Sequence, residues 1–229
     1  MDGLFARSEL VLGNDSTDIL KKKHAILFGL GGVGSYIAEA LARSGIGELT
    51  LVDNDTVSPS NRNRQLYALS STVGMLKTEV AKERIKDINP DCKVNIISKF
   101  CLPENIDEFF PCRYDYAADA IDTVSAKIAV VKKCKELGIP LISCMGTGNK
   151  LDPSLFRISD IYKTDTCPLC RVMRRELKAH GIDSLRVVWS PEAPCSSGSR
   201  TPGSLPFVPP VAGMLAAGEV ILNLLRNNI

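Results

Sequence analysis

A glycine-rich turn is the first segment of this chain that could do chemistry. Residues 29–34 read Gly-Leu-Gly-Gly-Val-Gly, follow the apolar run 24–29 and open a segment with helical spacing. In a turn of this G-x-G-x-x-G type, backbone N–H groups and a helix N-terminus can meet a phosphate. The turn therefore predicts a nucleotide site. Its candidate binding residues are Gly29, Gly31, Gly32 and Gly34.

An aspartate at the end of the next predicted strand strengthens this interpretation. Asp53 follows the apolar run 49–52, and a carboxylate at that position can hydrogen-bond the hydroxyls of a ribose. Asp55 is a second candidate contact to the nucleotide or a metal, and the alternative is that it caps the following loop. The turn and the aspartate together indicate a nucleotide without distinguishing ATP from NAD.

Fixed cations beyond Asp53 favour a triphosphate. Asn61 and Arg64 lie in the loop 61–65, which reads Asn-Arg-Asn-Arg-Gln, and Lys77 stands at the start of a predicted helix. Asp122 ends a strand at the carboxyl edge of the predicted sheet, where a carboxylate can hold Mg²⁺ against phosphates. We therefore expect ATP and Mg²⁺ as cofactors, with an NAD-binding module as the alternative.

Strands and helices alternate along the first two thirds of the chain. Strands are expected at 24–29, 49–52, 94–97, 116–121 and 141–144, and helices over 34–44, 72–89 and 124–137. This alternation predicts an α/β fold with a Rossmann-like, mostly parallel sheet and helices on both faces. The later segments are a strand near 154–159, a basic helix near 169–180, a strand near 185–189, a Pro/Ser/Gly loop over 191–206 and a last helix.

Length and composition place these elements in one soluble protein. The 229 residues, 45% of them hydrophobic, suffice for one substantial core. We expect a single ATP-binding domain over 1–229, with an N-terminal arm (1–20) and a C-terminal elaboration (146–229) that serves the substrate or a dimer. The net charge of +2 excludes a strong global field for nucleic acid and leaves room for a local basic patch.

The chain also has the features of a cytoplasmic protein. Its eight cysteines are scattered through apolar runs, which is typical of reduced thiols. The N-terminus lacks the pattern of a signal peptide. The longest apolar segment, 208–225, is interrupted by prolines and polar residues and is short for a membrane span of roughly 20 residues. No membrane association is expected.

Five segments in order resemble the adenylating enzymes of the molybdopterin and thiamine sulfur-carrier pathways and their ubiquitin-activating relatives. These segments are 29–34, 51–57, 61–65, 73–79 and 120–124. The resemblance implies a fold of the kind predicted above and an enzyme that adenylates a carboxylate. It further implies that Gly34 approaches the phosphates, that Asp53 binds the ribose, and that Asn61, Arg64 and Lys77 hold the triphosphate.

The same resemblance assigns the catalytic groups. Arg7, in the N-terminal arm, stands where family members carry an arginine that reaches the ATP of the other subunit, so the active enzyme would be a homodimer. Attack of a carboxylate on the α-phosphate brings two anions together, and positioned positive charge is needed to stabilise the leaving pyrophosphate. The candidate catalytic residues are Arg7, Arg64, Lys77 and, through Mg²⁺, Asp122.

Further segments resemble one branch of this superfamily, the tRNA threonylcarbamoyladenosine dehydratases. They are 44–53, 61–69, 86–94, 151–161 and 167–182. The resemblance implies a tRNA carrying threonylcarbamoyladenosine as the substrate, whose threonyl carboxylate is activated as an acyl-adenylate and then cyclised. The alternative is an adenylyltransferase that activates the C-terminus of a sulfur-carrier protein partner.

A cationic stripe on the predicted basic helix bears on the choice of substrate. Four cations spaced i, i+3, i+4 and i+7 fall on one face of a helix. Contacts to RNA phosphates need such clustered charge, whereas the alternative is a solvated surface. The candidate RNA-binding residues are Arg171, Arg174, Arg175 and Lys178.

The cysteines carry weaker signals. Cys167 and Cys170 form a C-x-x-C pair, which is half of a zinc site, but no second pair is present and structural thiols are favoured. Cys144 and Cys195 are candidate acyl acceptors. Packing is favoured for both, because neither sequence context indicates a lowered thiol pKa.

Overall fold

The computed structural model describes residues 3–195, 198–199 and 201–226, and its strands form one seven-stranded sheet. The strands are β1 (His24–Phe28), β2 (Glu48–Val52), β3 (Lys93–Ile97), β4 (Tyr116–Asp119), β5 (Leu141–Cys144), β6 (Arg157–Asp160) and β7 (Arg186–Trp189). Their order is β3-β2-β1-β4-β5-β7-β6, and every neighbouring pair is parallel except β6 with β7. The predicted mostly parallel α/β fold is confirmed.

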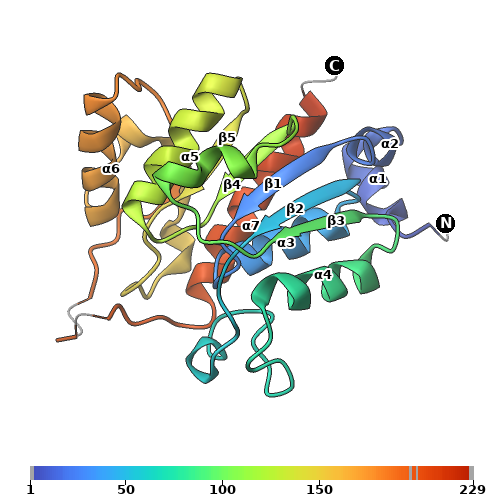
Figure 1. Cartoon of the computed structure of the whole chain (residues 1–229), viewed down its shortest axis with the longest axis horizontal. Coiled ribbons are helices and arrows are strands. Elements are labelled where there is room, and N and C mark those ends of the chain that lie inside the picture. Colours follow the sequence, from blue (N-terminus) through green and yellow to red (C-terminus); the bar gives the residue numbers. More distant parts are fainter. Residues whose placement is uncertain (1–2, 196–197, 200, 227–229) are drawn as a thin grey trace.

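Helices cover both faces of this sheet. They are α1 (Ala6–Leu12), α2 (Ser16–Leu20), α3 (Gly34–Arg43), α4 (Lys77–Ile88), α5 (Val124–Leu137), α6 (Pro168–Ala179) and α7 (Val208–Arg226), with short 3-10 turns η1 (Pro59–Asn61), η2 (Pro103–Phe109), η3 (Pro153–Leu155) and η4 (Ile161–Lys163). Figure 1 shows α3 and α7 on one face, α5 on the other, and α6 beside α5. The largest core cluster joins α3, α4 and α7 to the sheet.

The last helix, α7, belongs to this core. It is long and apolar enough to pass a length-and-composition test for a membrane span. However, Ala212, Ala216 and Val220 are fully buried in the main core cluster. A Cβ built on Gly213 would lie 2.5 Å from the carbonyl oxygen of Val33, so α7 crosses the start of α3 at backbone contact. The burial identifies α7 as a core helix and not as a membrane span.

The structure moves one predicted helix boundary in a way that matters for the site. The helix expected over 72–89 begins at Lys77 instead. Thr56 and Leu76 form an isolated antiparallel bridge, and Gly74 has a φ of +91°, so the segment before Lys77 cannot be helical. Lys77 is therefore the first residue of α4, beside the end of β2. The strand expected at 154–159 is likewise shifted, because η3 occupies its first half.

The order of the strands creates a crevice. From β1 the chain runs outward through β2 and β3, and it then returns to place β4 and β5 on the other side of β1. The loops after β1 and β4 consequently lead in opposite directions. In open parallel sheets, ligands bind at the carboxyl ends of the strands at such a reversal.

Candidate nucleotide site

A cavity of about 670 Å³ lies at this reversal, at the carboxyl ends of β1, β2, β4 and β5. Its wall combines loops that are far apart in the sequence, including the turn after β1 and residues near the start of α7. A volume of this size lies within the range of small-molecule sites, which is roughly 300–1,000 Å³. Of the residues predicted from the sequence, the wall includes Gly29, Gly31, Gly32, Asp53, Asp55, Asn61, Arg64, Lys77 and Asp122.

The glycines of the turn have different tasks. Gly29 has a φ of +88°, and a Cβ there would lie 2.8 Å from the carbonyl oxygen of Ala120. A Cβ on Gly34 would lie 1.8 Å from the carbonyl oxygen of Gly29, so Gly34 lets α3 pack against the turn. Gly31, by contrast, has room for a Cβ, whose nearest neighbour would be the side-chain amide nitrogen of Gln65 at an ordinary contact distance of 3.8 Å. Gly34 does not line the cavity, and the geometry favours packing over the phosphate contact expected for it.

Asp53 joins the glycine-rich turn to the end of β2. Its carboxylate accepts hydrogen bonds from the N–H of Leu30 at 2.7 Å and from the N–H of Asp55 at 2.8 Å. Burial raises the pKa of Asp53, and the nearby Lys77 ammonium opposes that shift. Because two backbone donors already occupy the carboxylate, Asp53 also fixes the shape of the nucleotide-binding turn.

Lys77 places a buried cation at the cavity. Its side chain is 6% exposed, and its Nζ lies 2.7 Å from Oδ2 of Asp55 and 3.9 Å from Oδ1 of Asp53. The Asp55 side chain is 59% exposed. Lys77 is therefore held in place by one inner and one outer carboxylate, and the outer one is free to move away.

Arg64 and Asn61 sit at the edge of the same cavity. The Arg64 guanidinium donates to the carbonyl oxygen of Ser60 at 2.9 Å and to the side-chain oxygen of Asn63 at 2.8 Å. The side-chain oxygen of Asn61 accepts from the N–H of Ser58 at 3.1 Å and so stabilises η1. These hydrogen bonds within the loop thus orient the Arg64 guanidinium at the edge of the cavity.

Asp122 offers an open carboxylate on the opposite wall. It is exposed on the loop between β4 and α5, and its carboxylate accepts a 3.4 Å hydrogen bond from the hydroxyl of Thr123. No group of three or more His, Cys, Asp or Glu suited to a metal occurs among the described residues. A single carboxylate suits Mg²⁺ that is held mainly by nucleotide phosphates and water.

Comparison with known proteins agrees with this site. Residues 5–228 match the model of the ThiF family. The tRNA threonylcarbamoyladenosine dehydratase of Bacillus subtilis is 42% identical over 97% of this chain and 95% of that protein. The chain belongs to the ThiF family, in the branch of these dehydratases.

Two further relatives of this ThiF-family chain bear on its chemistry. A crystal structure of the Escherichia coli tRNA N6-threonylcarbamoyladenosine dehydratase in complex with ATP superimposes with a TM-score of 0.93 at 35% identity, covering 98% of this chain and 94% of that one. The molybdopterin-synthase adenylyltransferase of Haemophilus influenzae is 35% identical over 56% of this chain and 53% of that protein. The resemblance to the dehydratases extends over more of the chain.

Several wall residues of the ThiF-family site were not anticipated from the sequence. Lys99 and Phe100, in the loop after β3, line the cavity. The segment 201–204 also lines it, and the side-chain amide of Asn63 donates to the carbonyl oxygen of Ser204 at 2.9 Å. The position of Lys99, two residues after the end of the parallel strand β3, was a signal that it lies at the same edge of the sheet as the cavity. The 201–204 segment gives no local signal, because its position depends on long-range contacts.

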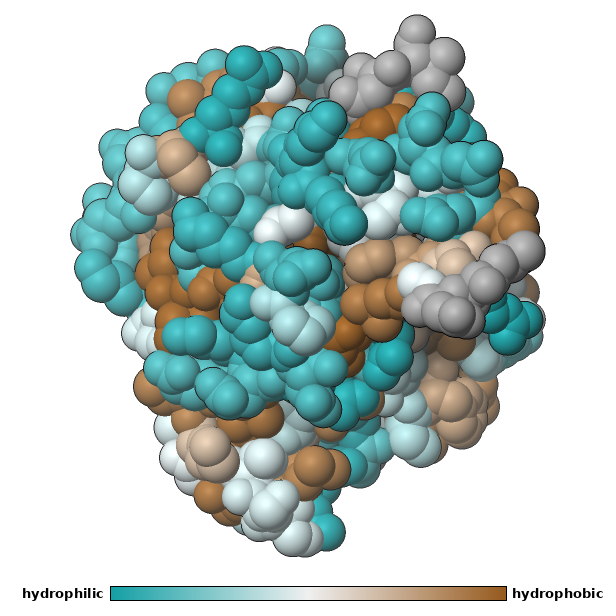
Figure 2. All heavy atoms as spheres, turned by 90° about the vertical axis from the view of Figure 1, so that its right-hand side faces the viewer, coloured by the Kyte–Doolittle hydropathy of each residue, from teal (hydrophilic) through white to brown (hydrophobic). Residues whose placement is uncertain are grey.

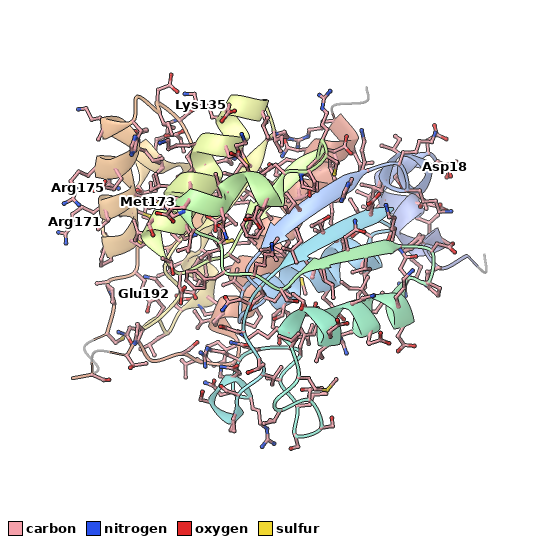
Figure 3. The ribbon with its side chains drawn as sticks, viewed as in Figure 1. Asp18, Lys135, Arg171, Met173, Arg175 and Glu192 are labelled. Atoms are coloured by element: carbon pink, nitrogen blue, oxygen red, sulfur yellow. The ribbon has the colours of Figure 1, made fainter. Side chains whose placement is uncertain are left out.

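The basic helix α6 begins at the edge of the cavity, where Leu169 lines it. Figure 3 shows Arg171 and Arg175 pointing outward from α6. Arg175 pairs with Glu176 at 2.6 Å, and Arg174 donates to the carbonyl oxygen of Thr164 at 2.9 Å. Among the described residues, Arg171 and Lys178 form no salt bridge. Of the four cations, Arg175 is paired with a carboxylate, whereas Arg174 keeps its charge and is turned toward Thr164. Arg171 and Lys178 are therefore the side chains best placed to meet a phosphate.

The cysteines divide into different environments. Cys167 is the N-cap residue of α6, and hydrogen bonds from the Cys170 thiol and from backbone N–H groups hold the pKa of Cys167 well below its usual value. The pKa of Cys170 is raised by the same partnership and by burial. Burial also raises the pKa of Cys144 to about 12, which disfavours it as an acyl acceptor. Cys195 is exposed in the loop before α7.

Proposed function

We propose that this chain catalyses the ATP-dependent cyclisation of threonylcarbamoyladenosine in tRNA, through an acyl-adenylate and with net loss of water. One observation carries the proposal. A phosphate-binding turn, the cations Arg64 and Lys77 and the carboxylate of Asp122 meet in one cavity, in a chain that matches a dehydratase over nearly its whole length.

The first step forms the adenylate. A threonyl carboxylate oxygen attacks the α-phosphorus of ATP, and the bond to pyrophosphate breaks. The turn around Gly31 cradles the phosphates, while Lys77 and Arg64 stabilise the charge that develops on the leaving pyrophosphate. No general base is required, since the carboxylate is already ionised at neutral pH. Mg²⁺ held by Asp122 would add positive charge against the phosphates.

Entry of ATP exchanges one partner of Lys77. In the structure its ammonium contacts the exposed carboxylate of Asp55 at 2.7 Å. A phosphate oxygen can take the place of that carboxylate, while Asp53 and the helix position keep Lys77 in register. The lysine is therefore preorganised before the nucleotide binds, which reduces the cost of ordering it during the reaction.

The second step closes the ring. A nucleophilic group of the same modified base attacks the activated acyl carbon, and AMP departs with one of the original carboxylate oxygens. The proton lost by the nucleophile passes to solvent. The sum of the two steps is conversion of ATP to AMP and pyrophosphate together with removal of the elements of water from the base.

The arm 1–20 completes the site in a homodimer. Arg7 is exposed on α1, and the neighbouring Phe5 packs against Gly45, just before β2 begins. The cavity lies at the other end of that five-residue strand, roughly 17 Å away along the sheet. Arg7 therefore serves a partner subunit's cavity. The exposed Leu4, Leu10 and Val11 of the arm fit a contact between copies.

The surface around the arm is consistent with this assignment. Figure 2 views the side of the molecule that carries α1 and α2, and hydrophobic patches interrupt its polar surface. The C-terminal elaboration, 146–229, contributes α6 and the 201–204 segment to the substrate side of the cavity. It belongs to the same proposed single domain over 1–229. The proposed setting is the cytoplasm, with tRNA as the partner.

The path through the adenylate is tested by following oxygen. The tRNA substrate carries ¹⁸O in the threonyl carboxylate, and the nucleotide products are analysed by mass spectrometry. The proposal predicts one ¹⁸O in AMP and none in pyrophosphate. ADP with ¹⁸O in inorganic phosphate would show activation by the γ-phosphate instead. Adenylation of a carrier-protein C-terminus without any reaction of the tRNA would assign the chain to the alternative class.

A further inference from the structure

A fully buried ion pair lies behind the Asp122 wall of the cavity. Lys127, in the first turns of α5, and Asp119, the last residue of β4, are both 0% exposed, and Nζ lies 2.9 Å from Oδ2. Lys127 also donates to the hydroxyl of Ser143 at 3.3 Å and to the carbonyl oxygen of Cys144 at 2.8 Å. All three ammonium hydrogens are therefore used.

The same cluster determines the course of the loop that carries Asp122. The second carboxylate oxygen of Asp119 accepts the N–H of Ile121 at 3.0 Å, directly before Asp122. The Ser143 hydroxyl donates to Asp119 at 2.6 Å. The cluster thus connects the end of β4, the start of α5 and the end of β5, which are the three segments that form this side of the cavity.

Stability alone does not account for this arrangement. Removing two charges from water is costly, and buried pairs are often replaceable by apolar residues without loss of stability. A cation near a helix N-terminus is also unfavourable with respect to the helix dipole. The cluster is nevertheless fully satisfied, since no buried side-chain polar atom lacks a hydrogen bond in the described part of the chain.

We propose that Asp119, Lys127 and Ser143 are positioning residues that fix the Asp122 carboxylate in the orientation needed to hold Mg²⁺–ATP. The proposal rests on the function proposed above. The cluster acts through Asp122 and touches neither nucleotide nor tRNA. Its loss should therefore change the Mg²⁺ dependence of ATP binding, while a merely structural pair would change only stability.

The test is a double-mutant cycle on ATP binding. Asp119→Asn combined with Lys127→Met removes both charges together and keeps an acceptor for the N–H of Ile121. The affinity for ATP is then measured by calorimetry at a series of Mg²⁺ concentrations, in proteins with and without Asp122→Ala. We expect the Mg²⁺ needed for half-maximal ATP binding to rise by about tenfold, as for other groups that orient a metal ligand. In the Asp122→Ala background the double change should add nothing.

A matched control separates positioning from stability. Glu39 is 7% exposed and pairs with Arg84 at 2.7 Å between α3 and α4, outside the cavity wall. Glu39→Gln should lower the melting temperature without changing the Mg²⁺ dependence. If the Asp119→Asn, Lys127→Met protein does not fold, Ser143→Ala takes its place with a smaller expected rise.

The outcomes separate the two proposals. A wild-type Mg²⁺ dependence in the folded variant, or an equal effect without Asp122, overturns the positioning role. Absence of ATP binding by the wild-type protein overturns the proposed function itself.

Discussion

Lys77 lies against two aspartates, Asp53 and Asp55. The Asp53 contact lies inside the protein and the Asp55 contact lies at the surface, so only the second can be exchanged for phosphate. We infer that Asp55 acts as an internal substitute for a phosphate group. Its carboxylate holds the lysine extended toward the cavity.

Substitution of Lys77 tests this residue's assignment. Lys77→Ala should reduce turnover on the order of a hundredfold or more, because the interaction with leaving pyrophosphate is strongest in the transition state. Steady-state kinetics with ATP and modified tRNA measures the effect. Lys82→Ala, on the same helix and outside the cavity wall, is the control. Near-wild-type formation of AMP by Lys77→Ala would remove Lys77 from the mechanism.

The two glycines of the turn should behave differently. Gly34→Ala forces a Cβ to within 1.8 Å of a carbonyl oxygen, so we expect a loss of stability of about 3 kcal/mol. Gly31→Ala has no close atom and should fold normally but bind ATP more weakly, since its methyl group occupies phosphate space. Thermal unfolding and calorimetry of each variant decide the point. Equal stability of the two variants would contradict this division.

At this scale the sequence located most of the candidate site. The motifs predicted that Asp53, Arg64, Lys77 and Asp122 lie near one nucleotide, and all four line one cavity. They meet there because the carboxyl ends of parallel strands lie at one edge of the sheet. It did not reveal that Asp119 and Lys127 pair behind that edge. A lysine within an apolar helical run has no local signature of burial, and its partner comes from another element.

Among the elements, α6 is the candidate contact to a tRNA substrate. It starts at the cavity and exposes cations along its outer side, but Arg174 and Arg175 are engaged by Thr164 and Glu176. Of the four expected RNA-binding residues, Arg171 and Lys178 are therefore the ones that we expect to contact RNA phosphates. A helix so placed could follow an RNA backbone while the modified base enters the cavity.

Charge reversal on α6 tests this contact. Arg171→Glu and Lys178→Glu should each weaken tRNA binding and lower the slope of log affinity against log salt by somewhat under one unit. ATP affinity should stay unchanged, since neither residue lines the cavity. Lys132→Glu, an exposed lysine on α5, is the matched control. Wild-type affinity and salt slope in both α6 variants would mean that tRNA binds elsewhere.

The element boundaries show where sequence patterns stop being informative. Helical spacing placed the start of α4 five residues too early, because a long-range bridge between Thr56 and Leu76 overrides local propensity there. The later start makes Lys77 the first residue of α4. The alternation of strands and helices was predicted correctly, since burial on both faces of a parallel sheet produces it directly.

At the scale of the whole molecule, one subunit does not contain all the proposed catalytic groups. Arg7 lies at the amino-end side of the strands, and the cavity lies at their carboxyl ends. A homodimer in which the arm stays packed on its own subunit and Arg7 projects across the contact would bring each Arg7 to the partner's site. The sequence alone could suggest this arrangement only through family resemblance, because no spacing encodes a contact between subunits.

Mixing of subunits tests the dimer. Arg7→Ala and Asp122→Ala proteins should each be inactive, and their mixture should regain about a quarter of wild-type activity, because only mixed dimers contain one intact site. Activity is measured after subunit exchange has been shown with labelled protein. No recovery after complete exchange would place Arg7 in its own subunit's site or outside catalysis.

The whole molecule is proposed to remove water from a modified adenosine in tRNA with conversion of ATP to AMP and pyrophosphate. Nucleoside mass analysis of tRNA carrying threonylcarbamoyladenosine, after incubation with the protein, ATP and Mg²⁺, tests it most directly. We predict loss of the mass of one water from that nucleoside, with AMP formed in equal amount and the reaction of Lys77→Ala slowed on the order of a hundredfold or more. An unchanged nucleoside, with wild-type protein that is folded and binds ATP, would contradict the account.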